Sequence, residues 1–277
     1  MPCTRRHLCI AALLAGAASA GWTAPASTGA DDRGVALVIG NSDYRIGALK
    51  NPVNDARAVA DTLRTLGFDV TLRENTSLRD MIESFRKFSL TARSARVRVL
   101  YYAGHGVQVQ GRNYLLPVDT EIHGEDEMAA KSADLNELIE RLGAMAQGIN
   151  IVILDACRNN PFSGAMILGP DGRRLKFRGA APGGLAAVDA PLGSMVAFST
   201  APGGVALDNP NESNSLYTRH LLSAMQTPGL AVELLFKQVR LAVASDTGRV
   251  QVPWESSSLT GDFCFKLGPQ GGCSVAR

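Results

Sequence analysis

Apolar stretches of strand length alternate along this chain with stretches in which apolar residues recur at helical spacing. A continuous apolar run predicts a strand covered on both faces over 35–39, and further strands are predicted over 68–72, 97–102, 149–154 and 195–199. Apolar positions three or four residues apart predict helices over 51–66, 78–88, 134–145, 216–225 and 231–243. Strands that alternate with helices build a parallel sheet with helices on both faces. The pattern therefore predicts an α/β protein.

Polar residues mark several element boundaries. Asn51, followed by a proline, opens the first helix as a capping residue, and Ser77 and Asp134 are expected to cap the second and third. Two short apolar runs at 107–109 and 114–116 flank a glycine-containing turn, which predicts a hairpin. Together with the apolar patterns, these signals predict regular elements from residue 35 to residue 154.

The pattern stops between 163 and 193. This segment is rich in glycine, proline and alanine and has no apolar period. A structureless segment of such length inside a compact domain is typical of a functional or mobile loop.

The segment 1–24 is typical of an export signal. Arg5 and Arg6 precede an apolar run over 8–20 that ends in Ala-Ser-Ala, a small-x-small cleavage pattern. This run is shorter than the roughly 20 apolar residues that cross a bilayer, and no later stretch reaches that length. We therefore expect a signal peptide at 1–24, a linker at 25–33, and a soluble mature protein without a membrane span, periplasmic or secreted. The twin-arginine and general secretion routes both fit, and a cytosolic protein with an apolar start is the alternative.

Composition and charge narrow the classes of partner. The 277 residues carry 28 Lys and Arg against 26 Asp and Glu, a net charge of +2. Without Arg5 and Arg6 the balance is 26 against 26, because the segment 1–24 holds no acid. A neutral mature chain has no long-range attraction for nucleic acid or an anionic membrane, so we expect neither as a partner. The composition leaves the oligomeric state open.

Cleavage also changes the cysteine count. Two of the five cysteines lie in the signal, which leaves Cys157, Cys264 and Cys273. An odd count in an oxidising compartment indicates one pair and one free thiol. Cys264 and Cys273 flank a short Gly/Pro-rich loop that can close a disulfide, although two unpaired thiols in a frayed tail fit as well. Cys157 is then the thiol that needs an explanation.

A histidine and a cysteine follow two of the predicted strands. The third strand runs into Gly104-His105-Gly106 and the fourth into a segment that ends in Cys157. Because the carboxyl ends of neighbouring parallel strands share one edge of a sheet, a histidine there can activate the thiol as a nucleophile. The glycines are expected to let a substrate backbone approach, and the N–H groups of Gly106 and Cys157 to form an oxyanion hole. The alternative is a buried core cysteine and a histidine with ordinary polar partners.

Several segments resemble the caspase/metacaspase superfamily, specifically the caspase-like peptidases of bacteria. They are ALVIGNSDY, LKNPVNDA, LGFDV, YYAGHGVQVQGRNYLLPVD and NIVILDACRNNPF, in family order. The separation of His105 from Cys157 is also close to the caspase spacing of about 50 residues.

The resemblance implies a caspase-like three-layer α/β/α sandwich with a mostly parallel central sheet. Residues 34–162 resemble the large catalytic subunit and residues 194–267 the small one, separated by an intersubunit loop at 163–193. The peptidase domain would then cover 34–267, followed by a tail at 268–277. The implied activity is that of a cysteine endopeptidase with His105 and Cys157 as its catalytic dyad.

Two acidic residues bear on specificity. Asp155 stands where caspases have glutamine, and Asp55 lies in the Asn-Asp-Ala motif; the resemblance implies that both line the primary specificity pocket. Two carboxylates favour a guanidinium or ammonium group, so we expect protein or peptide substrates that are cleaved after Arg or Lys. The alternative for Asp55 is a surface residue in the first turn of a helix. The chain departs from many members in having Ala103 where they have serine.

The intersubunit loop offers basic residues to such a pocket. Caspase-type enzymes are often cut between their subunits, which makes this loop a candidate for self-processing, against the alternative of a solvated loop. The candidates are Arg173, Arg174, Lys176 and Arg178.

No cofactor is expected. An acidic segment lies near where calcium-dependent metacaspases bind their ion, but it lacks their Asp–Asp spacing, and a solvated acidic loop is the alternative to calcium binding. Its members are Asp119, Glu121, Glu125, Asp126 and Glu127. The chain has neither an HExxH nor a CxxC pattern, which argues against zinc. Two non-enzymatic alternatives remain: a catalytically silent caspase-fold binding or regulatory module, and a structural envelope protein in which Cys157 is buried.

Overall fold

The computed structural model of the protein describes residues 34–122, 124–145, 147–157, 167–168, 174–175, 185–202, 206 and 212–273. For residues 157, 167–168 and 174–175 it describes the backbone alone. The expected signal peptide and linker lie outside the described residues.

One central sheet organises the described chain. Its strands follow the order β10-β9-β6-β3-β1-β2, and β4 and β5 extend it beside β3. All neighbours along the main path are parallel except β10, which runs antiparallel to β9. The bounds are β1 Val35–Gly40, β2 Asp69–Glu74, β3 Val97–Val109, β4 Arg112–Leu115, β5 Ala133–Asp134, β6 Ile149–Cys157, β9 Ser194–Phe198 and β10 Trp254–Ser257.

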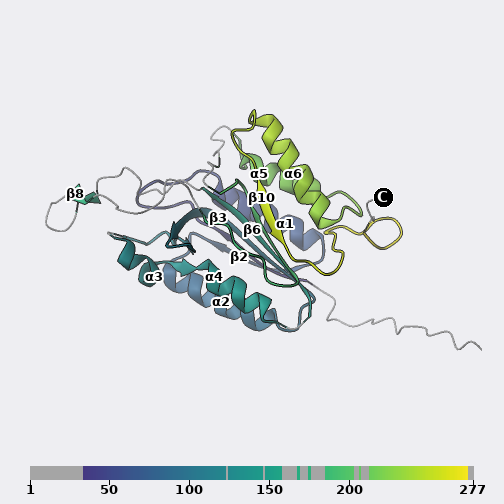
Figure 1. The fold of residues 1–277 in the computed structure, drawn as a ribbon, viewed down its shortest axis with the longest axis horizontal. Helices are drawn as coiled ribbons and strands as arrows, with labels where there is room; N and C mark the ends of the chain where they lie inside the picture. The colour runs from purple at the N-terminus through teal and green to yellow at the C-terminus, as the bar shows by residue number, and fades with distance from the viewer. Residues whose placement is uncertain are drawn as a thin grey trace, which may run out of the picture. The chain divides into compact units, whose positions relative to one another are not determined.

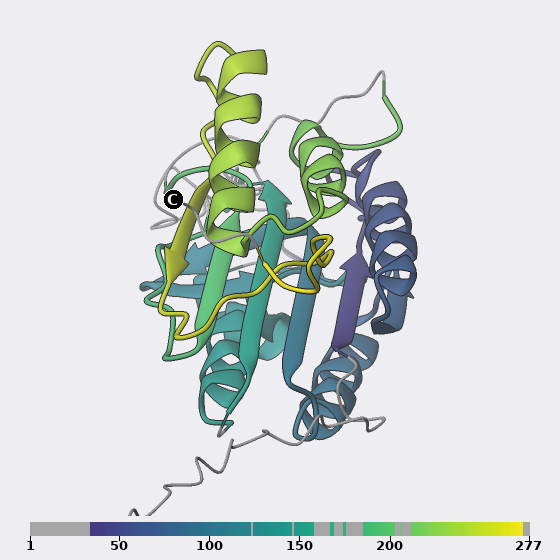
Figure 2. The ribbon, with the colours of Figure 1, turned by 90° about the vertical axis from the view of Figure 1, so that its right-hand side faces the viewer.

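Helices cover both faces of this sheet (Figure 1). On one face lie α1 Pro52–Thr65, α5 Leu216–Met225 and α6 Val232–Asp246; on the other lie α2 Leu78–Thr91 and α4 Leu135–Gly143. The short elements η2 Glu125–Glu127 and α3 Met128–Lys131 lie between β4 and β5 in the sequence. Figure 2 shows the strands side by side in the order given above. The architecture is the mostly parallel α/β/α sandwich that the sequence predicts.

The four inner strands β1, β3, β6 and β9 are rich in apolar residues because each is buried on both sides, whereas the edge strand β2 is partly exposed. Successive side chains of a strand point to opposite faces. Val38 and Tyr101 belong to the apolar cluster under α1, α5 and α6, whereas Leu37 and Leu100 belong to the cluster under α2 and α4. Both clusters are fully buried at these positions, so neither face of the strand tolerates a polar repeat.

Most predicted boundaries lie within a few residues of the observed ones. Ser77 caps α2 by accepting a hydrogen bond from the Asp80 N–H, and Asp134 caps α4 by accepting one from the Glu137 N–H. Asn51 also precedes its helix, but its side chain makes no capping hydrogen bond. The expectation of a side-chain cap there was wrong.

Other elements depart from the prediction more clearly. The third strand was expected to end at residue 102, yet β3 continues to Val109 and turns directly into β4. In the junction expected to lack structure, β7 Ile167–Leu168 and β8 Arg174–Leu175 pair antiparallel. The sequence pattern also missed β5 and β10, because both are too short or too polar to form an apolar run.

The C-terminal segment carries a disulfide and packs against the core through Phe265. The structure joins Cys264 to Cys273, with their Cα atoms 5.5 Å apart. The neighbouring Phe265 is buried, and its ring centroid lies 6.2 Å from that of Phe68. The segment after β10 is thereby fastened beside the start of β2.

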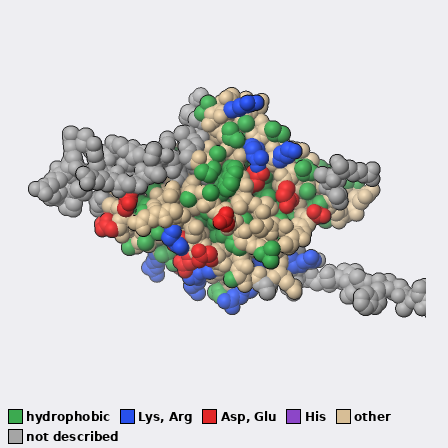
Figure 3. Space-filling model, in the orientation of Figure 1, with side chains coloured by type: hydrophobic (Ala, Val, Ile, Leu, Met, Phe, Trp, Pro, Cys, Tyr) green, Lys and Arg blue, Asp and Glu red, His purple; other side chains and the backbone are tan. Residues whose placement is uncertain are grey.

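Two further observations concern the helices and the surface charge. Among the described residues, none of the helices has the length and apolar character needed to span a bilayer. On the face visible in Figure 3, acidic and basic side chains are interspersed.

Candidate active site

His105 and Cys157 are neighbours across two central strands. The parallel pairing of β3 with β6 ends at the register pair His105 and Cys157. From Gly106 onward β3 pairs antiparallel with β4 instead. Adjacent strands lie about 4.8 Å apart, so the two backbones are in direct lateral contact at this point. The histidine lies inside a strand, not after its end as the sequence indicated, and marks where β3 changes partners.

The imidazole of His105 is fixed on one side only. It is 6% exposed, and its Nε2 lies 2.6 Å from the carbonyl oxygen of Gly47. A carbonyl only accepts, so Nε2 carries the proton and Nδ1 of the neutral ring has the lone pair. Among the described residues Nδ1 has no hydrogen-bond partner. Burial lowers the pKa of His105, and the Gly47 carbonyl partly opposes this shift.

The carbonyl that fixes the ring comes from the loop after β1. This loop closes on itself through a hydrogen bond of 3.0 Å from the Leu49 N–H to the Ser42 oxygen. Gly47 adopts a φ of +72°, a conformation that favours glycine. The sequence analysis missed this loop. The strand order could have indicated this loop. β1 lies beside β3 in the sheet, so the loop that follows β1 reaches the histidine on β3.

The two glycines around the histidine are tightly packed against side chains of the protein itself. A Cβ on Gly104 would lie 2.5 Å from the hydroxyl of Tyr44, and a Cβ on Gly106 would lie 2.9 Å from the side chain of Leu185. The space that glycine provides here is filled by the protein's own side chains. The expectation that these glycines let a substrate backbone approach stays a prediction.

Ser215 contacts both predicted specificity acids. Asp55 accepts hydrogen bonds from the Ser215 N–H at 2.9 Å and from the Asn214 amide at 2.8 Å. Asp155 accepts one from the Ser215 hydroxyl and one of 2.8 Å from Thr218. Asp55 is only 1% exposed, so the alternative of a surface helix residue is wrong. The sequence analysis missed Ser215, which caps α5.

The negative charges of Asp55 and Asp155 affect the ionisation of the buried Tyr101. Burial, and then the negative charges of Asp155 and Asp55, raise the pKa of Tyr101 well above its usual value. Ala103, where many family members have serine, is the register partner of Asp155 on the adjacent strand. A methyl group therefore stands beside the carboxylate at the position of the missing hydroxyl.

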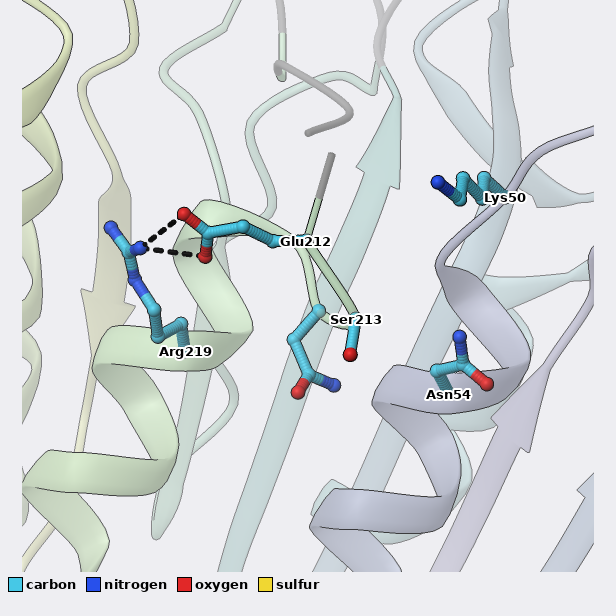
Figure 4. A pocket seen from close by; sticks show the side chains of 6 residues that line it. Lys50, Asn54, Glu212, Ser213 and Arg219 are labelled. Atoms are coloured by element: carbon cyan, nitrogen blue, oxygen red, sulfur yellow. Dashed lines mark hydrogen bonds and ion pairs between the residues drawn. The ribbon is translucent and has the colours of Figure 1, made fainter. Parts of the chain in front are cut away.

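A pocket of about 520 Å³ opens next to Asp55. Asn214, which donates to Asp55, is one of its walls. Figure 4 shows Glu212 and Arg219 on the α5 side, joined by an ion pair of 2.6 Å, and Lys50 and Asn54 on the α1 side. The full lining is Lys50, Asn54, Glu212, Ser213, Asn214 and Arg219. The pocket thus lies between the parts that resemble the large and the small subunit.

Three of the five acidic residues considered for calcium make contacts with other parts of the protein. Asp119 accepts a hydrogen bond of 3.0 Å from the Leu78 N–H at the start of α2. Glu121 pairs with Arg45, and Glu127 pairs with Lys131 at 2.8 Å. Across the described ranges, no group of three or more His, Cys, Asp or Glu residues is arranged to hold a metal ion.

The basic candidates for self-processing are not described as side chains. Arg174 contributes its backbone to β8. Arg173, Lys176 and Arg178 lie outside the described residues.

An α/β/α sandwich with a histidine and a cysteine in register on two central strands is consistent with a caspase-like fold. The family described as the caspase domain matches residues 33–264, so the chain belongs to the caspase-domain family of cysteine peptidases. Its relatives include mucosa-associated lymphoid tissue lymphoma translocation protein 1 of Homo sapiens, 31% identical over 125 residues, and its homolog in Mus musculus, 30% identical over 125 residues. Each match covers 45% of this chain but only 15% of the relative.

Proposed function

We propose that the protein is a cysteine endopeptidase in which Cys157 is the nucleophile and His105 the acid and base. The observation that carries this proposal is the register pair at the end of β6 together with the proton on Nε2, which leaves Nδ1 as the basic nitrogen. Nδ1 takes the thiol proton as the sulfur attacks the scissile carbonyl carbon. It then gives that proton to the departing amine, and the N–H groups of Gly106 and Cys157 stabilise the oxyanion.

The second half of the reaction returns the enzyme to its starting state. Nδ1 takes a proton from water as the water oxygen attacks the thioester carbonyl. The carbon–sulfur bond breaks, the new carboxyl product leaves, and Cys157 regains the proton. Each step uses Nδ1 alone, so the Gly47 carbonyl holds Nε2 throughout the cycle.

We also propose that the substrates are proteins or peptides with Arg or Lys at the cleavage site. Asp55 and Asp155 both accept hydrogen bonds from Ser215, the residue that caps α5. Asp155 lies two residues before Cys157. A paired negative potential there favours a cationic side chain and disfavours an acidic one. The proposed reaction needs no metal cofactor, and calcium is the alternative to be tested.

The test compares turnover of fluorogenic peptides that differ only in having Arg, Lys or Asp at the cleavage site. Cys157→Ala should reduce turnover at least about 1000-fold. Asp155→Asn, which keeps the shape but removes the charge, should reduce kcat/KM for the Arg peptide about 100-fold. Each assay is run with calcium and with a chelator. Turnover that survives in Cys157→Ala, or a preference for Asp, would overturn the respective part of the proposal.

A complete absence of Cys157-dependent turnover would favour a caspase-fold binding module. The alanine beside Asp155 is the observation that keeps this second function open, because a hydroxyl common in the family is missing there.

Export and self-processing complete the proposal. The segment 1–24 directs the chain to the periplasm or beyond, and the loop with Arg173, Arg174, Lys176 and Arg178 is a substrate of the same active site. Intact-mass spectrometry of the purified protein and of Cys157→Ala tests both. The signal mass should be missing in both proteins, and a cut in the loop should be present in the active one alone.

A further inference from the structure

We propose that Tyr44 is a positioning residue for His105, an inference that rests on the proposed dyad. Tyr44 holds the histidine in two ways. Its hydroxyl accepts a hydrogen bond of 2.9 Å from the backbone N–H of His105. Its ring centroid lies 4.4 Å from that of the imidazole, with the ring planes tilted by 52°. Backbone and side chain of the histidine are thus held by one residue.

The hydroxyl is part of a small buried network. The Tyr44 oxygen lies 3.2 Å from the hydroxyl oxygen of Tyr102 and 3.2 Å from the Leu116 carbonyl, while the Tyr102 hydroxyl lies 2.8 Å from the carbonyl of His105. Burial, and then Tyr44, raise the pKa of Tyr102 well above its usual value, so the Tyr102 hydroxyl keeps its proton and can donate. The N–H and the C=O of His105 are therefore each bonded to a tyrosine.

Glycine at 104 is what admits this network. A Cβ there would lie 2.5 Å from the Tyr44 hydroxyl oxygen and 2.7 Å from that of Tyr102. The backbone of Gly104 has a φ of +152°, and the strand continues through it into His105. The glycine before the histidine thus leaves room for the two tyrosine hydroxyls.

The contact matters because Tyr44 and Gly47 belong to the same loop. The Gly47 carbonyl decides which imidazole nitrogen carries the proton, and among the described residues nothing holds Nδ1. If the loop moved relative to β3, the Nε2 contact would be lost and the ring would no longer present Nδ1 to Cys157. Tyr44 prevents this movement by joining the loop to the backbone of the histidine.

The test measures the pH dependence of Cys157 alkylation by iodoacetamide, which needs no peptide substrate. His105 should lower the midpoint for the wild type below that of His105→Gln, which should react as an ordinary thiol with a midpoint near about 8.5. Tyr44→Phe keeps the ring and loses the hydroxyl, so its midpoint should rise toward that of His105→Gln by about one pH unit. With an Arg peptide, kcat should fall about tenfold while KM stays the same.

The control is Tyr114→Phe, which removes a hydroxyl from the same apolar cluster and should react like the wild type. A second variant, Tyr44→Met, loses both hydroxyl and ring and should shift the midpoint at least as far. A wild-type midpoint in Tyr44→Phe or Tyr44→Met would overturn the positioning role. Equal midpoints for the wild type and His105→Gln would overturn the dyad itself, and the inference with it.

Discussion

The two ends of the central strands hold buried polar side chains of opposite character. At the amino end, Arg98, Asn150 and Ser194 form one row across β3, β6 and β9. At the carboxyl end, His105 and Asp155 lie on the same β3 and β6. Both groups are buried in the same sheet, so a comparison of their hydrogen bonds separates what stabilises the fold from what is kept available for chemistry.

The amino-end row is fully engaged. The Arg98 guanidinium donates to the Ala92 carbonyl at 2.5 Å, to the Asn150 side chain at 3.1 Å and to the Gln147 carbonyl at 2.9 Å. The Asn150 amide then donates to the Ser194 hydroxyl at 3.0 Å. A buried network in which each member has partners rigidifies a structure. This end joins α2, the loop before β6 and three strands.

The carboxyl end leaves groups unpartnered. Among the described residues, His105 Nδ1, the Ser199 hydroxyl and the Tyr217 hydroxyl are buried without hydrogen bonds. Ser199 follows β9, and its N–H donates to the Leu154 carbonyl, so it lies beside the end of β6. Unsatisfied buried polar groups cost stability and are retained where a site requires them. The fully hydrogen-bonded network and the unpartnered groups therefore lie at opposite ends of the same central strands.

Breaking the amino end should cost the most. Arg98→Met removes the donors of two buried acceptors, on Ala92 and Asn150, and of the partly buried Gln147 carbonyl. It should lower the free energy of unfolding by about 3 kcal/mol, as measured by urea unfolding. The midpoint of Cys157 alkylation should not change. Arg93→Met, at an exposed arginine, is the control and should cost less than about 0.5 kcal/mol. If both variants unfolded at the same urea concentration, the stabilising role of this end would be wrong.

A smaller effect distinguishes two buried tyrosines near the carboxyl end. The Tyr101 hydroxyl lies 2.6 Å from that of Thr218, so Tyr101→Phe should cost about 1 kcal/mol. The Tyr217 hydroxyl has no hydrogen-bond partner in the described part of the chain, so Tyr217→Phe should be neutral or stabilising. Thermal unfolding of both variants measures the difference. A greater loss for Tyr217→Phe would show that its hydroxyl has a partner.

The weakest of these effects is the pH dependence of stability at His105. Because burial lowers its pKa in the folded protein, the unfolded chain binds a proton more readily in the window just below about 6.5. Stability should therefore fall as the pH decreases through that window and level off below the folded-state pKa. His105→Gln should have a flatter profile in urea unfolding between about pH 7.5 and 5. Parallel profiles would contradict this assignment.

Local pattern predicted the layers of the fold but not the contacts of the site. Continuous apolar runs identified β1 and β6, because a strand buried on both faces has no polar repeat. The pattern failed at His105, where Gly-His-Gly resembles a turn; the strand continues there because β4 pairs with it. Family resemblance supplied Asp55 and Asp155 as pocket residues, a role that is still a prediction.

The positioning contacts were beyond a reading of local sequence. Gly47 lies 58 residues before His105 in the chain, and Ser215 lies 160 residues after Asp55. Such pairs meet only when the sheet has formed, and no spacing rule relates them. The buried Arg98 was missed for a similar reason, since an arginine in an apolar run indicates an exposed position until its acceptors are known.

The position of β9 matters for a chain that has been cut. β9 lies between β6 and β10, so residues on either side of the intersubunit loop share one sheet. Asn113 also binds the Ala186 backbone through both ends of its amide, at 2.6 and 3.2 Å. We therefore expect the folded structure to persist after a cut in this loop. A nicked chain would run as two fragments on a denaturing gel and as one particle in gel filtration.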